Sequence, residues 1–178
     1  LVAQHPGQFA CIVLEAAATE RPKDRYLEKV QALRRANDII FILDEMITGF
    51  RWPMKGAQHI YGITPDLCTF GKAMANGDAV ACVAGKREIM ELGSIEFEGR
   101  ERTFLLSTTH GAEMCGLGAF VATVKFMQKY RVVEHLWDYG TRLMAMMQCK
   151  AKGYGIGENF KVGGIACSPY YQTLDSSG

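Results

Sequence analysis

The 178-residue sequence has no apolar run that approaches the roughly 18 residues needed to cross a bilayer. Glu15 and Asp44 interrupt its two most apolar stretches, so we exclude a membrane-spanning helix and expect no membrane partner. An excess of charge is also missing, because 20 basic residues against 19 acidic ones leave a net charge of +1. Without a basic field, we expect no nucleic-acid partner.

Paired cysteine motifs are absent as well. The six cysteines form no C-x-x-C pair, and none shares metal-ligand spacing with any of the four histidines, so we expect no metal site. Most of the cysteines sit in apolar stretches, which predicts reduced, buried thiols in a cytoplasmic protein rather than disulfides. They are Cys11, Cys68, Cys82, Cys115, Cys149 and Cys167.

What is present is the composition of a globular protein, with 48% hydrophobic and 22% charged residues. The length is enough for one domain with a sizeable core. The sequence starts at Leu1 rather than at a methionine, and its last residues follow a segment that reads like the beginning of further structure. We therefore expect a piece of a longer chain.

The first 44 residues have the pattern of a strand, a helix and a second strand. Phe9–Leu14 and Ile39–Leu43 are short, almost continuous apolar runs, typical of strands buried on both faces of a parallel sheet. Between them, Pro22 is expected to open a helix whose apolar residues recur at helical spacing, with Asn37 as the stop. The sequence thus predicts an α/β fold with a mostly parallel sheet flanked by helices.

The rest of the chain is divided by glycines and prolines into shorter elements. We expect short helices at 57–61 and 86–92, strands at 67–70 and 103–107, a further apolar run at 79–84, and two longer helices at 113–130 and 132–150. In such folds, ligands bind at the carboxyl ends of the strands.

Two residues follow predicted strands in places suited to chemistry. Asp44 ends the second strand, and Lys72 follows another strand in a loop of small residues, G-K-A-M-A-N-G. A desolvated lysine can form a Schiff base, and a carboxylate can pair with a protonated ring nitrogen, which together form the minimal apparatus for pyridoxal phosphate. An aspartate after a strand is more often a turn former or helix cap, and a lysine in a glycine loop is usually solvated. The pattern alone does not choose between these interpretations.

A second hypothesis comes from the strand F-I-L-D-E, which looks like the magnesium-binding strand of P-loop ATPases. That function needs G-x-x-x-x-G-K-[ST] elsewhere. Gly71-Lys72 and Gly85-Lys86 lack both the following Ser or Thr and the upstream glycine, which argues against it.

Four blocks in order carry a more specific resemblance: D-E-M-I-T-G-F-R at 44–51, G-A-Q at 56–58, G-I-T-P-D-L at 62–67 and G-K-A-M at 71–74. Together, and with Lys72 lying 28 positions after Asp44, they strongly resemble the class III pyridoxal phosphate-dependent aminotransferases, in the branch around glutamate-1-semialdehyde 2,1-aminomutase. The resemblance runs from about Phe9 to Leu143. It implies the large domain of a fold-type-I pyridoxal phosphate enzyme.

The resemblance also implies roles for individual residues. Lys72 matches the catalytic lysine that forms the internal aldimine with the cofactor and later moves the proton. Asp44 matches the aspartate that pairs with the pyridine nitrogen, and Met46 the residue that packs on one face of the ring. Thr109, with Thr108 as second choice, matches the threonine that binds the cofactor phosphate across a homodimer interface.

The implied reaction transfers an amino group from a small-molecule donor to a carbonyl acceptor. The sequence departs from the family pattern after the lysine, where Ala75-Asn76-Gly77-Asp78-Ala79 replaces a glycine-rich block with a proline, and at Ala16, where a proline is usual. An aminomutase, and a non-catalytic relative that keeps only the fold, therefore stay open as alternatives. We expect residues 1–150 to be the central part of the cofactor-binding large domain and 151–178 the start of a C-terminal small domain.

Overall fold

A computed structural model describes residues 1–17, 19–94, 96, 99 and 111–175. Its strands are β1 (Cys11–Glu15), β2 (Ile40–Asp44), β3 (Leu67–Phe70), β4 (Cys82–Gly85), β5 (Phe160–Ile165) and β6 (Ser168–Thr173). Its α-helices are α1 (Tyr26–Ala36), α2 (Ala57–Tyr61), α3 (Arg87–Met90), α4 (Met114–Tyr130) and α5 (Val132–Gly153). Short 3-10 helices occur at η1 (Val2–Gln4), η2 (Lys72–Met74) and η3 (Glu91–Gly93).

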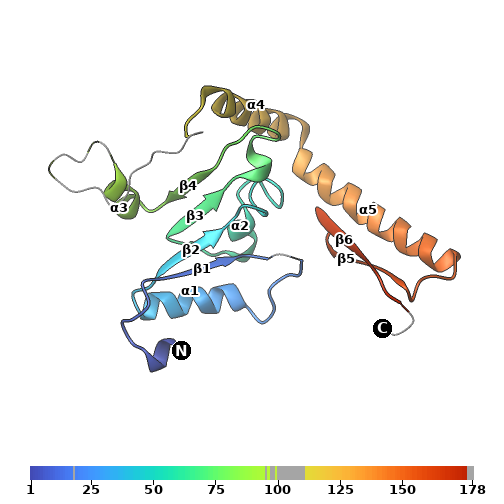
Figure 1. Cartoon of the computed structure of the whole chain (residues 1–178), viewed down its shortest axis with the longest axis horizontal. Helices are drawn as coiled ribbons and strands as arrows, with labels where there is room; N and C mark the ends of the chain where they lie inside the picture. Colours follow the sequence, from blue (N-terminus) through green and yellow to red (C-terminus); the bar gives the residue numbers. More distant parts are fainter. Residues whose placement is uncertain (18, 95, 97–98, 100–110, 176–178) are drawn as a thin grey trace.

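The main sheet has the order β1-β2-β3-β4, as Figure 1 shows. β1, β2 and β3 are parallel, whereas β4 runs antiparallel to β3. Its core forms where Phe41 and Leu43 of β2, both fully buried, pack with Leu27 of α1 and Trp52 of the following loop. The predicted α/β fold with a mostly parallel sheet is confirmed.

Helix α1 starts four residues later than predicted. Pro22 does not open it, because Asp24 and Arg25 adopt positive φ angles of 53° and 54°, and helical geometry begins only at Tyr26. Asn37 ends the helix as expected, and its side-chain amide donates a 2.8 Å hydrogen bond to the Leu33 carbonyl. A positive φ is costly for residues other than glycine, so this turn sets a firm start for the helix.

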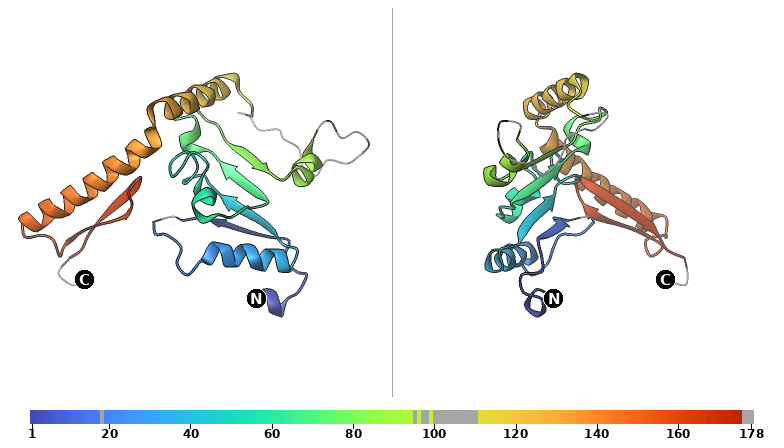
Figure 2. Two further views of the ribbon diagram at one scale, coloured as in Figure 1. Left: turned by 180° about the vertical axis from the view of Figure 1, so that it is seen from behind. Right: turned by 60° about the vertical axis from the view of Figure 1, so that its left-hand side comes forward.

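The two long helices match their predicted ranges closely, and the β5–β6 hairpin follows them. α5 extends away from the sheet, with the hairpin lying along it (Figure 1, Figure 2). The hairpin turn joins the main core, since Ile165 is buried there. Helix α5 is tied to the loop after β2, because the Trp137 indole donates a 3.0 Å hydrogen bond to the Trp52 carbonyl. The sequence did not predict this hairpin. The expected strand at 103–107 lies outside the described residues.

The prediction of buried cysteines is wrong for most of the six. All are free thiols, but Cys11, Cys82, Cys115 and Cys149 are exposed and only Cys68 is buried. Burial raises the pKa of the Cys68 thiol to about 12, with the Glu45 carboxylate adding to the effect. Cys11 and Cys82 belong to the two outer strands of the sheet, which explains why apolar sequence surroundings did not bury them. No helix in the described parts of the chain is long and apolar enough to span a bilayer.

Candidate functional site

The carboxyl ends of the three parallel strands place three polar side chains in one row. Glu15 of β1 pairs in register with Asp44 of β2, and Asp44 pairs with Thr69 of β3. Because neighbouring strands lie about 4.8 Å apart, these residues occupy the same edge of the sheet. That edge is where an α/β fold presents ligand-binding groups.

Asp44 holds one carboxylate oxygen fixed and leaves the other available. Its Oδ1 accepts a 2.8 Å hydrogen bond from the Met46 amide and a 3.0 Å hydrogen bond from the Thr69 hydroxyl. Among the described residues, no donor bonds to Oδ2. The half-buried carboxylate is therefore oriented by the protein and still has an acceptor for a ligand.

Lys72 comes two residues after β3 and begins the short helix η2. Its φ of 46° is unusual for a residue with a side chain, and the side chain is exposed. The Lys72 amine makes no hydrogen bond or ion pair with another described residue. A strained turn that carries an unpaired amine next to a ligand-binding edge is typical of functional positions.

Met46 and Gly71 link the loops that follow β2 and β3. A Cβ atom built on Gly71 would lie 2.5 Å from Met46 Cε and 2.9 Å from its sulfur, so the methionine occupies the space that a side chain at 71 would need. Gly71 has an extended φ of −177°, and its role is therefore this close approach rather than an unusual backbone conformation. Met46 is thereby held beside the residue that precedes Lys72.

Glu45 supports the site from behind and was not singled out by sequence reasoning. It is fully buried, and its carboxylate accepts hydrogen bonds from the Thr48 hydroxyl and, at 2.8 and 2.9 Å, from the amides of Ala57 and Gln58 at the start of α2. A carboxylate at a helix N-terminus is stabilised by the unpaired amides there. All of these contacts are internal, so Glu45 organises the loop after β2 and is not available as a metal ligand.

Thr108 and Thr109 lie outside the described residues. Of the other three predicted site residues, Asp44 bonds to the Met46 amide, and Met46 packs against Gly71, the residue before Lys72. Thr69 is a member of the site that sequence reasoning missed. The signal for it was the pairing of the two strands, because register sets Thr69 opposite Asp44.

The residues present fit a pyridoxal phosphate cofactor. Asp44 Oδ2 is an oriented acceptor for a protonated ring nitrogen, and Lys72 Nζ is an unpaired amine for an aldehyde. Met46 supplies an apolar side chain against Gly71, the residue before Lys72. The arrangement can therefore hold a charged heteroaromatic ring and bond covalently to it.

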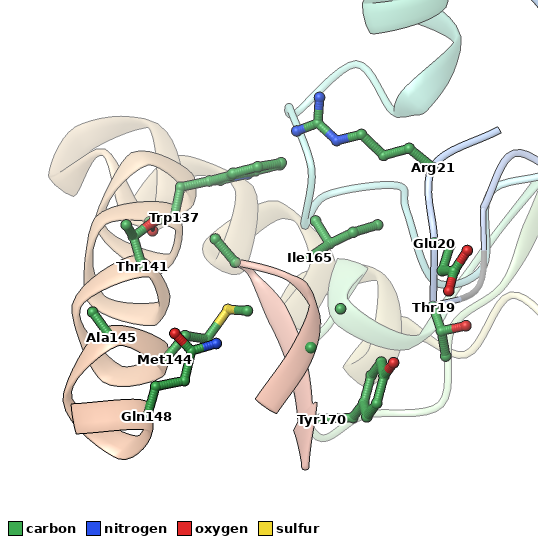
Figure 3. A pocket seen from close by; sticks show the side chains of 13 residues that line it. Thr19, Glu20, Arg21, Trp137, Thr141, Met144, Ala145, Gln148, Ile165 and Tyr170 are labelled. Carbon is green, nitrogen blue, oxygen red and sulfur yellow. Dashed lines mark hydrogen bonds between the residues drawn. The ribbon is translucent and has the colours of Figure 1, made fainter. Parts of the chain in front are cut away.

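A separate pocket lies elsewhere, between the loop at 19–21, α5 and the β5–β6 hairpin (Figure 3). It has a volume of about 690 Å³. Arg21 lies over the Trp137 ring at 5.6 Å from its centroid, and Thr141, Gln148 and Tyr170 contribute polar groups. None of Asp44, Met46 and Lys72 lines this pocket, so it is not the predicted site.

Comparison with known proteins agrees with the geometry. The chain is 34% identical over 154 residues to the 3-aminobutyryl-CoA aminotransferase of Cloacimonas acidaminovorans, covering 86% of the chain and 35% of that relative. It is 32% identical over 173 residues to the glutamate-1-semialdehyde 2,1-aminomutase of Methanocaldococcus jannaschii, covering 89% of the chain and 38% of that relative. The chain thus spans well under half the length of these curated relatives.

Solved structures share the fold. An omega-transaminase from Sphaerobacter thermophilus superimposes with a TM-score of 0.82 at 22% identity, over 98% of this chain and 39% of the other. The FumI protein of Sphingopyxis sp. MTA144 gives a TM-score of 0.84 at 18% identity, over 98% of this chain and 41% of the other. At these identities the likeness shows the fold, and it confirms the predicted transaminase-type architecture.

The family model for class III aminotransferases matches residues 1–168, nearly the whole chain. The matched range includes Asp44 at the end of β2 and Lys72 in η2, together with the motifs between them. The chain belongs to the class III aminotransferase family.

Proposed function

We propose that the protein is a pyridoxal phosphate-dependent aminotransferase, with Lys72 as its catalytic residue and Asp44 and Met46 in the cofactor site. The observation that carries the proposal is the edge of the sheet. There, an aspartate with one oriented and one available oxygen lies on the strand next to the one that leads into an unpaired lysine. Family membership supports the same cofactor, and a related solved structure is a transaminase with pyridoxal phosphate bound.

The roles of the residues follow from their chemistry. When bound, pyridoxal phosphate supplies an aldehyde that reacts with amines and a ring that withdraws electrons from carbon. Asp44 Oδ2 would accept the hydrogen bond of a protonated ring nitrogen, which would favour the positive charge on the ring. Lys72 Nζ would be the amine that bonds to this aldehyde and, when free, the general base that moves a proton. Met46 would offer its apolar side chain to one face of the ring.

Substitution of Lys72 tests the proposal directly. We expect the protein expressed from its complete coding sequence to develop a new visible absorption band with pyridoxal phosphate, and borohydride to trap the cofactor on the peptide containing Lys72. Lys72→Ala removes the amine and should lose both the band and the trapped peptide. Lys55→Ala, a loop lysine outside the site, is the matched control and should keep both. A band that persists in Lys72→Ala would contradict the proposal.

An intramolecular amino transfer is the second candidate, because several relatives at 30 to 34% identity are glutamate-1-semialdehyde 2,1-aminomutases. The two activities differ in their need for an acceptor. An aminotransferase transfers the amino group of a donor only when a separate carbonyl compound is added, whereas an aminomutase converts glutamate-1-semialdehyde alone. A protein that binds no cofactor in this assay would instead be the non-catalytic relative.

The proposal extends to groups that the described residues do not include. Thr109, or Thr108 beside it, would bind the cofactor phosphate from the partner subunit of a homodimer. Exposed apolar side chains on α4, among them Leu117 and Val121, support such an interface. Residues 1–150 would form the central part of the large domain and 151–178 the start of the small domain. The free state of all six cysteines supports a cytoplasmic location.

A further inference from the structure

We propose that Thr69 is a positioning residue that selects which oxygen of Asp44 faces the cofactor ring. The inference rests on the proposed function. Thr69 lies on β3 directly opposite Asp44, and its hydroxyl donates a 3.0 Å hydrogen bond to Asp44 Oδ1. The amide of Met46 donates to the same oxygen at 2.8 Å. Two donors on Oδ1, and none from the described residues on Oδ2, fix the rotation of the carboxylate.

Thr69 is well suited to this task. A β-branched side chain in a strand has a restricted χ1 angle, so the hydroxyl keeps its direction without a large loss of entropy. The residue is half-buried, and its backbone carbonyl accepts a 3.0 Å hydrogen bond from the Glu45 amide, which anchors Thr69 to the loop after β2. Support of this kind, behind a residue that contacts the ligand, sets the precision of a site.

Without the hydroxyl, the carboxylate keeps only the Met46 amide and gains rotational freedom. A freely rotating carboxylate pairs less well with a ring nitrogen, because the charge-assisted hydrogen bond depends on direction. The effect must therefore be confined to ligands that carry a protonated nitrogen at that position. A residue with a purely structural role would weaken the binding of any ligand of the same shape.

The test compares two ligands, using protein expressed from the complete coding sequence. One is pyridoxal phosphate, and the other is the analogue in which a C–H group replaces the ring nitrogen. We expect Thr69→Val to raise the Kd of pyridoxal phosphate about tenfold, as for loss of one hydrogen bond to a charged group. The Kd of the carbon analogue should change by less than about twofold. Thr69→Ser keeps the donor but not the β-branch, and it should bind pyridoxal phosphate much more tightly than Thr69→Val does.

Thr48→Val is the matched control. Thr48 also donates its hydroxyl to a carboxylate, that of Glu45, but this carboxylate is occupied by internal contacts. We expect this variant to lower the thermal midpoint and to leave the ratio of the two Kd values unchanged. If Thr69→Val weakens the binding of both ligands equally, or of neither, the role of Thr69 would be overturned while the proposed function stays intact. A wild-type protein that binds neither ligand would overturn both.

Discussion

At the scale of single residues, Asp66 is the most constrained charged group of the fold. It is 2% exposed, and its Oδ1 lies 2.9 Å from Arg34 Nη1 of α1 and 2.8 Å from Lys86 Nζ, just after β4. Its Oδ2 accepts a 2.8 Å hydrogen bond from the Phe41 amide of β2. Burial alone would raise the pKa of Asp66, but Lys86, the Phe41 amide and Arg34 outweigh it, and the pKa lies below its ordinary value. One carboxylate thus joins three elements around the start of β3.

We expect Asp66→Asn to lower the free energy of unfolding by about 3 kcal/mol, because Arg34 is left without its buried partner. The lowered pKa also sets the sign of the pH dependence. The stabilisation by Asp66 is complete above the unfolded pKa of about 3.9 and is lost as the pH falls through the lower folded value. Urea unfolding from pH 7 to pH 3 should therefore show a smaller acid-induced loss in the variant than in the wild type.

Asp138→Asn is the control, since Asp138 forms an exposed ion pair with Arg142 on one turn of α5. Exposed ion pairs contribute little to stability, so the free energy of unfolding should change by no more than about 0.5 kcal/mol. Parallel pH curves for wild type and Asp66→Asn would contradict the assigned role.

At the scale of elements, the β5–β6 hairpin is held to α5 by a contact that only glycine permits. A Cβ atom on Gly140 would lie 1.7 Å from the carbonyl oxygen of Ala166 in the hairpin turn. The approach is between two backbones, so neither side can relax by rotating a side chain. This contact brings Ile165 into the main core and so fixes the hairpin relative to the sheet.

Replacing glycine by alanine inside a helix normally stabilises it by about 1 kcal/mol. We expect Gly140→Ala instead to lower the free energy of unfolding by about 2 kcal/mol or more, because the hairpin must move away from α5. Gly118→Ala in α4 is the matched substitution, since nothing lies within 4 Å of its added Cβ, and it should raise stability. Chemical denaturation measures the change in the free energy of unfolding for each variant. A change of the same sign in both variants would contradict the role of Gly140.

At the scale of the whole molecule, this chain exposes much more surface than a compact protein of its size. Its accessible area is 12341 Å², whereas a compact monomer of 19.7 kDa exposes about 8,600 Å². Within the described residues, the outer edges of β1 and β4 pair with no further strand. Apolar residues on α4 add to the excess, since Leu117 is 40% exposed and Val121 48% exposed. Surface of this kind marks contact with further protein.

If the protein forms the proposed homodimer through α4, we expect the Leu117→Asp, Val121→Asp double variant to shift it from dimer toward monomer in sedimentation velocity, because charges would be buried in an apolar interface. Gln128→Asp changes another exposed position of the same helix and should leave the dimer unchanged. A double variant that sediments like the wild type, or a monomeric wild type, would show that α4 is not the interface.

Local patterns in the sequence were enough for much of the fold and the site. Strands β2 and β3 and helix α2 were predicted within one residue, because short apolar runs and helical spacing are properties of neighbouring residues. The same holds for Asp44 and Lys72, whose places after strands follow from the chain itself. The family resemblance rested on blocks at characteristic distances, and the family match confirmed it.

Other features depended on contacts between residues distant in the sequence. Strand pairing sets the antiparallel direction of β4 and the β5–β6 hairpin. What covers each edge of the sheet sets the exposure of Cys11 and Cys82. The hydrogen bond from Thr69 to Asp44 likewise spans 25 residues and exists only through strand register. The sequence by itself determined which residues we propose to carry the chemistry, Asp44 and Lys72 among them, because that information is local. Only the tertiary structure decided how they are oriented, because orientation comes from partners brought together by folding.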